Sequence, residues 1–168
     1  PDLAIYEGQK LKIISCQWAR AIKSCNPTFS NVDVPLATTF YLSTKKGKEA
    51  YIQPIIKGDH YVFEVKNGRP ENDSQVKLGT SAGKRSAFRC IMSGSPIPYE
   101  YIRDEGAKGN ITFLLMALVA QGKKGRIFLS PPPEYLSRIK DDSPKWIPDL
   151  ELANNTRYLA TTKYVMKT

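Results

Sequence analysis

Apolar and polar residues alternate over several stretches of the chain, a pattern typical of half-buried β-strands. The first stretch covers residues 10–23, where Ile, Trp and Ala recur with partial alternation. A second stretch, residues 37–43, is rich in Thr, Phe and Tyr, which favour strands. In residues 61–66 Tyr, Phe and Val largely alternate with Glu and Lys, so one face of that strand should meet solvent. The pattern therefore predicts a β-dominated chain.

Two glycine-containing turns predict hairpins. Residues 57–60, Lys-Gly-Asp-His, interrupt an otherwise strand-like stretch over 51–66. Residues 121–125, Gln-Gly-Lys-Lys-Gly, do the same within 113–129. Short turns of this composition between two apolar runs are typical of antiparallel pairs.

Other segments lack this alternation. Residues 24–35 and about 67–86 are rich in Asn, Ser, Pro or Gly, and we predict loops there, the second one long and flexible. A short helix is predicted over 98–105, since Pro98 suits a first helical turn and Gly106 suits a helix end.

A length of 168 residues suits one domain with appendages. We expect a single β-rich domain over 1–143 and an extended C-terminal tail over 144–168, which has little periodicity. The predicted fold class is α+β, β-dominated, with antiparallel hairpins and short helices. Because the chain begins with Pro1, we also expect it to be a piece of a longer protein.

The chain is strongly basic. It carries 25 Lys and Arg against 16 Asp and Glu, a net charge of +9, which favours a polyanionic partner such as DNA. The basic side chains gather at three places that can contact phosphates. The predicted nucleic-acid contacts are Lys45, Lys46, Lys48, Lys84, Arg85, Arg89, Lys123, Lys124 and Arg126.

Three cysteines, Cys16, Cys25 and Cys90, make an odd number. The sequence shows no signal-like N-terminal segment and no apolar run near the roughly 20 residues of a membrane span. We therefore expect a cytoplasmic protein with free thiols and no membrane partner.

Two turns resemble halves of a zinc ribbon. Cys25 and Cys90 each open a turn, but Ser93 stands where a second ligand belongs after Cys90, and Phe29 or Ser30 stands there after Cys25. A neutral hydroxyl is a poor zinc ligand because it must ionise first, so we predict no metal. The degenerate ribbon-like positions are Cys25, Cys90 and Ser93. The alternatives are a metal-free ribbon held by packing and ordinary core cysteines.

No complete catalytic or cofactor site is visible. His60 is the single histidine and lies in a predicted turn, and no Ser or Cys has a recognisable activating base. Residues 79–86 lack one residue of a phosphate-binding loop. Ser130-Pro-Pro echoes the catalytic tetrapeptide of amino-methyltransferases, but Pro133 replaces the required aromatic residue. We predict that this segment alone is not an enzyme.

Several stretches, in order along almost the whole chain, carry a family resemblance. The most specific are Phe40-Tyr-Leu-Ser-Thr-Lys-Lys-Gly-Lys48, Arg89-Cys90 to Gly94, Pro98 to Gly106 and Gly122 to Leu129. They resemble the middle region of the large prokaryotic adenine-specific DNA methylases that contain a zinc ribbon and an N-terminal domain of unknown function. The chain departs from that family at the ribbon, where family members commonly show two cysteine pairs.

The resemblance implies an insertion between a cofactor loop for S-adenosylmethionine and an Asp-Pro-Pro-Tyr-type catalytic tetrapeptide, both outside these residues. The parent protein would methylate an exocyclic amino group of DNA, that of adenine, in restriction-modification or phage defence. This segment would need no cofactor of its own. Its expected partners are DNA and the rest of the methylase chain. It would be a DNA-binding or target-recognition module, or alternatively a structural or protein-interaction insertion without DNA contact.

Overall fold

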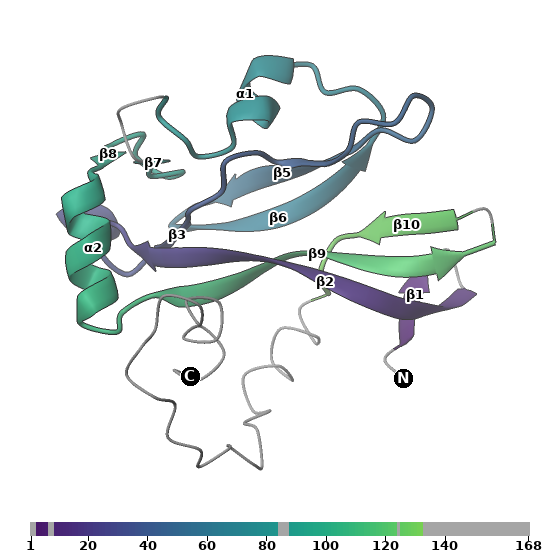
Figure 1. Cartoon of the computed structure of the whole chain (residues 1–168), viewed down its shortest axis with the longest axis horizontal. Coiled ribbons are helices and arrows are strands. Elements are labelled where there is room, and N and C mark those ends of the chain that lie inside the picture. Colours follow the sequence, from purple (N-terminus) through teal and green to yellow (C-terminus); the bar gives the residue numbers. More distant parts are fainter. Residues whose placement is uncertain (1–2, 7–8, 84–87, 124, 133–168) are drawn as a thin grey trace, which may run out of the picture. The chain divides into compact units, whose positions relative to one another are not determined.

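A computed structural model of the chain describes residues 3–6, 9–83, 88–123 and 125–132 (Figure 1). The fold is β-dominated, with antiparallel sheets and a few short helices, as the sequence predicts. None of the described helices is long and apolar enough to cross a membrane. The predicted tail over 144–168, and the last part of the predicted domain over 1–143, lie outside the described residues.

The larger sheet has five strands. Four follow the order β1-β2-β9-β10, and β3 pairs with the C-terminal end of β2. All pairings are antiparallel. The strands span Leu3–Tyr6 (β1), Gln9–Lys23 (β2), Asp33–Pro35 (β3), Thr112–Gly122 (β9) and Gly125–Leu129 (β10).

The long central pair explains the apolar run near residue 115. β9 is buried at every position from Leu115 to Ala120, so both of its faces are covered. A strand buried on both faces requires a continuous apolar run, which this stretch supplies. Its partner β2 changes register twice, between Ile13 and Ser15 and between Gln17 and Trp18. Such irregularities bend and twist a strand.

The smaller sheet has three strands in the order β4-β5-β6. They span Tyr41–Ser43 (β4), Ala50–Lys57 (β5) and His60–Asn67 (β6). Lys57 pairs with His60, so the β5–β6 connection is a two-residue hairpin loop, and its Gly58 adopts φ +63°. A positive φ suits glycine at this place in a tight hairpin. Both predicted hairpins, β5–β6 and β9–β10, are confirmed.

One core cluster joins the two sheets. Phe40 and Ile52 from the smaller sheet's side pack with Ala19, Met116 and Ala117 of the larger sheet. A hydrogen bond reinforces this contact at one edge. The Ser130 hydroxyl, just after β10, accepts from the Val65 N–H of β6 at 2.8 Å.

The helices correct part of the sequence prediction. Residues 67–86 were predicted to be a loop, but they contain α1, Asp73–Leu78. The Asn72 side chain caps this helix by accepting from the Gln75 N–H at 3.1 Å. α1 has six residues, and only Val76 is buried. Because one buried position cannot repeat with the helical period, the sequence gave no periodic signal for this helix.

The remaining short elements flank the cysteine turns. Residues 24–35, predicted as a loop, hold the 3₁₀-helix η1, Pro27–Phe29, and also β3. The two-residue strands β7, Phe88–Arg89, and β8, Pro96–Ile97, pair with each other. The predicted helix near residue 100 is present as α2, Tyr99–Ala107.

A buried hydroxyl holds the connection between the sheets. Thr80 is 4% exposed, and its Oγ1 donates to the Pro35 carbonyl at 2.6 Å and accepts from the Ala37 N–H at 3.1 Å. Gly79, beside it, has φ +59°, and a Cβ there would lie 2.5 Å from the Ala37 carbonyl oxygen. The chain therefore crosses from β3 to β4 pressed against the end of α1.

We predict that Gly79→Ala destabilises the fold by more than about 2 kcal/mol, because it combines a positive φ with a backbone clash. Gly58→Ala is a matched control, since Gly58 has a similar φ of +63° but nothing within 4 Å of the added Cβ. Urea unfolding of both variants measures the difference. Equal losses of unfolding free energy would show that the close approach at Gly79 contributes nothing.

Candidate nucleic-acid interface

Two basic turns from different sheets come together. The β4–β5 turn carries Lys45, Lys46 and Lys48, and the β9–β10 hairpin carries Lys123 and Arg126; all five are exposed. Lys48 Nζ lies 3.4 Å from the position that a Cβ on Gly125 would take. Figure 1 shows the start of β5 and the β9–β10 hairpin at the same, right-hand end of the view. We call these five residues the basic end.

The other predicted contacts do not all join the basic end. Arg89 lies on β7, which Figure 1 shows at the left, away from the two turns. Lys84, Arg85 and Lys124 lie outside the described residues. Of the nine predicted contacts, five therefore converge at the basic end, Arg89 lies apart from them, and the remaining three lie outside the described residues.

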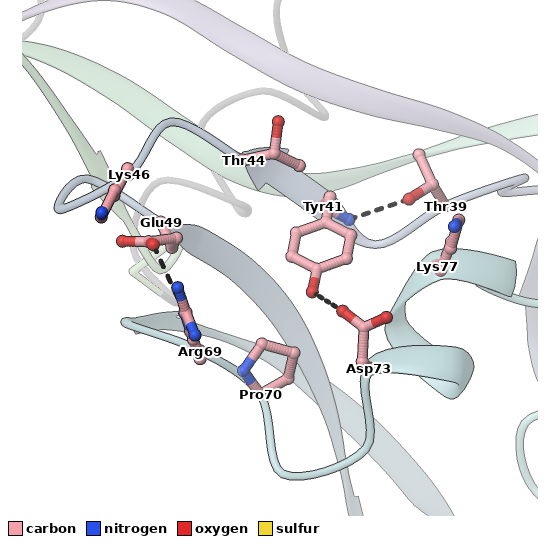
Figure 2. A pocket seen from close by; sticks show the side chains of 9 residues that line it. All are labelled: Thr39, Tyr41, Thr44, Lys46, Glu49, Arg69, Pro70, Asp73 and Lys77. Atoms are coloured by element: carbon pink, nitrogen blue, oxygen red, sulfur yellow. Dashed lines mark hydrogen bonds and ion pairs between the residues drawn. The ribbon is translucent and has the colours of Figure 1, made fainter.

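A cavity of about 870 Å³ lies next to the β4–β5 turn (Figure 2). One wall comes from the chain around β4 and the other from the segment that leads into α1. The lining residues are Thr39, Tyr41, Thr44, Lys46, Glu49, Arg69, Pro70, Asp73 and Lys77. Of these only Lys46 was predicted as a site residue. Lys77 was missed because it lies on α1, which gave no periodic signal, and Arg69 was missed because it lies in the segment between β6 and α1 that was predicted as a loop.

The Tyr41 side chain is fixed in the cavity. Its hydroxyl donates to an Asp73 carboxylate oxygen, Oδ1, and its backbone N–H donates to Thr39 Oγ1 at 3.1 Å. The hydrogen bond to Asp73 raises the pKa of Tyr41, because ionisation would place two negative charges side by side. Tyr41 also packs against the core cluster between the sheets. Its ring is therefore held in place before any ligand arrives.

The charges around the cavity are unevenly paired. Arg69 Nε lies 3.7 Å from Glu49 Oε1, a contact visible in Figure 2. Lys46 and Lys77 form no ion pair among the described residues. Three cations against two carboxylates leave a local charge of +1, so the cavity can accept an anion.

The two cysteine turns also meet. Ser24 Oγ donates to Cys90 Sγ at 3.4 Å, and Asn26 Nδ2 donates to Ser95 Oγ at 3.3 Å. Cys25 Sγ lies 3.4 Å from the carbonyl of Pro96, and Ser93 Oγ donates to Ser95 Oγ at 3.0 Å. The turns thus lie side by side, as in a ribbon, and hydrogen bonds between side chains join them.

This donor set does not fit zinc. Among the described residues no group of three His, Cys, Asp or Glu side chains comes together. The neighbours of Cys90 are serine hydroxyls, which bind zinc only after losing a proton. A zinc ribbon is therefore not shown in this part of the chain.

The Cys90 thiol has an unusual environment for a residue that is 2% exposed. Burial by itself would raise its pKa, but hydrogen bonds from the Ser24 and Ser93 hydroxyls and from the backbone at Ser93 and Met92 favour the thiolate. The net effect places the pKa of Cys90 below that of an ordinary thiol.

Comparison of the sequence with protein-family models, with curated proteins and with solved structures found no match. The resemblance to the DNA methylases therefore stays a prediction that rests on the residues quoted above.

We predict that Ser24→Ala raises the pKa of Cys90, because it removes the first hydrogen bond that favours the thiolate. Thiolate ultraviolet absorbance against pH, in a Cys16→Ser/Cys25→Ser background, measures the shift. Ser30→Ala, an exposed serine of the same turn, should leave the midpoint unchanged.

The lowered pKa has a consequence for stability. The Cys90 thiolate should contribute fully to the free energy of unfolding above the pKa of the thiol in the unfolded chain, about 8.5. That contribution should be lost as the pH falls through the lower pKa of Cys90 in the folded protein. The free energy of unfolding of the same background should therefore rise with pH through this window, and a flat profile would contradict the assignment.

Proposed function

We propose that this segment is a non-catalytic DNA-binding or target-recognition module of an S-adenosylmethionine-dependent DNA adenine-N6 methyltransferase of a restriction or phage-defence type. The observation that carries the DNA contact is the convergence of the two basic turns, with Lys48 Nζ beside Gly125. Lysine and arginine side chains on two adjoining turns suit contacts to successive backbone phosphates, which give affinity without reading sequence.

The overall charge supports the same partner. A net charge of +9 attracts a polyanion over long range, and the basic end gives that attraction a defined place on the fold. The cavity beside the β4–β5 turn adds Arg69 and Lys77, which line it together with Lys46.

The methylase assignment is supported by the ordered resemblance along the chain, above all by residues 40–48, 89–94 and 98–106. In this proposal the parent protein supplies the S-adenosylmethionine loop and the catalytic tetrapeptide. The segment described here contributes affinity and orientation for DNA.

A structural or protein-interaction insertion is the second candidate, and one observation favours it. Trp18 and Phe113 are 42% and 56% exposed. Trp18 pairs with Leu115 and Arg20 pairs with Phe113, so the two aromatic rings share one face of the β2–β9 pair. Exposed aromatic side chains on one sheet face are typical of a surface that contacts another protein or domain.

The DNA-binding proposal predicts strong salt dependence. In fluorescence-anisotropy titrations with a duplex, Lys45→Gln and Lys123→Gln should each reduce the slope of log K against log salt by about 0.9. Lys57→Gln removes the same charge at the far end of β5 and should leave the slope unchanged. Absence of duplex affinity at low salt would overturn the proposal and favour the second candidate.

A further inference from the structure

The cavity beside Tyr41 has the size of a small-ligand site and not that of a duplex groove. Its volume of about 870 Å³ lies within the range of pockets that hold one small molecule or one residue of a polymer. It shares the β4–β5 turn with the basic end, because Lys46 lines the cavity while Lys45 and Lys48 belong to the same turn. A DNA strand bound at the basic end would therefore lie next to Lys46, which also lines the cavity.

The cavity combines three kinds of group. Tyr41 offers an aromatic ring, Asp73 a carboxylate, and Lys46 and Lys77 two cations without ion-pair partners among the described residues (Figure 2). An aromatic ring stacks on a nucleobase of any sequence. A carboxylate accepts from an exocyclic amino group, and lysine contacts phosphate.

Asp73 keeps capacity for such a contact. The Tyr41 hydroxyl occupies Oδ1, and Oδ2 has no hydrogen-bond partner among the described residues. An ionised carboxylate has about four lone-pair sites, so one hydrogen bond from Tyr41 does not saturate it. The same hydrogen bond fixes the ring and the carboxylate relative to each other, which lowers the ordering cost of binding.

We propose that this cavity takes one unpaired nucleotide of the bound DNA, with an amino-bearing base, adenine or cytosine, against Tyr41 and Asp73 and its phosphate at the lysines. This inference rests on the proposed function, since it requires that DNA lie on the basic end. It adds a preference among DNA structures that backbone contacts alone do not give.

The test compares three DNAs that share the same paired sequence: a fully paired duplex, that duplex with one unpaired adenine, and that duplex with one unpaired thymine. Anisotropy titrations at fixed salt measure the three affinities. We expect the unpaired-adenine duplex to bind roughly tenfold more tightly than the paired duplex, on the scale of one base–aromatic stack. The unpaired-thymine duplex should bind less tightly than the adenine one, because thymine has no exocyclic amino group.

Variants at Tyr41 and Asp73 locate the nucleotide. Tyr41→Leu should abolish the preference for an unpaired base, whereas Tyr41→Phe keeps the ring and should retain it. Asp73→Asn should shift the preference from unpaired adenine toward unpaired thymine, because its amide oxygen can still accept from Tyr41 while its NH₂ group donates to carbonyl oxygens. Glu71→Gln, which removes an exposed carboxylate of the same segment that does not line the cavity, is the control and should change nothing.

The outcomes separate the two proposals. Equal, salt-dependent affinity for all three DNAs would overturn the nucleotide pocket and leave the DNA-binding proposal standing. A preference that survives in Tyr41→Leu and Asp73→Asn would also overturn it, since the nucleotide would then bind elsewhere. No affinity for any of the DNAs would overturn both proposals.

Discussion

The hydroxyl of Thr80 is the contact on which the arrangement of the two sheets depends. It bridges the Pro35 carbonyl, at the end of β3, and the Ala37 N–H, at the start of the passage to β4. Both backbone groups belong to buried residues, and leaving a buried polar group without a partner costs roughly 1–3 kcal/mol. A backbone hydrogen bond from the Phe40 N–H to the Val76 carbonyl, at 2.7 Å, continues the attachment of this passage to α1.

The candidate site is built on that attachment. The passage from β3 to β4 carries Thr39, and β4 begins with Tyr41. Asp73 and Lys77 lie on α1, so the contact that joins the sheets also sets the two walls of the cavity. Backbone hydrogen bonds within the fold fix these walls before any ligand is present. The basic end adds charge to this rigid frame, because its lysines lie on turns whose strands are held in the sheets.

Sequence patterns predicted the longer strands and the hairpins, because alternation and glycine turns are local signals, but they missed β1 and β3. The β5–β6 and β9–β10 pairs follow directly from residues 57–60 and 121–125. The pattern missed α1, whose place is set by an Asn72 cap and one buried valine. It also could not place Arg69 and Lys77 beside Tyr41, or separate Arg89 from the other cations, since these relations arise only from tertiary packing. The meeting of the cysteine turns was suggested by analogy, while the serine contacts that join them were not.

The two-residue loop at the tip of β5–β6 has a practical consequence for the molecule as a scaffold. Residues 57–60 are all exposed, and nothing lies within 4 Å of a Cβ atom added at Gly58. β5 is eight residues long, which separates this loop from the β4–β5 turn by roughly 25 Å. A peptide tag, a fluorophore or a surface tether inserted here would leave the opposite end of the sheet accessible. The protein thus carries a built-in point of attachment for single-molecule or immobilised work.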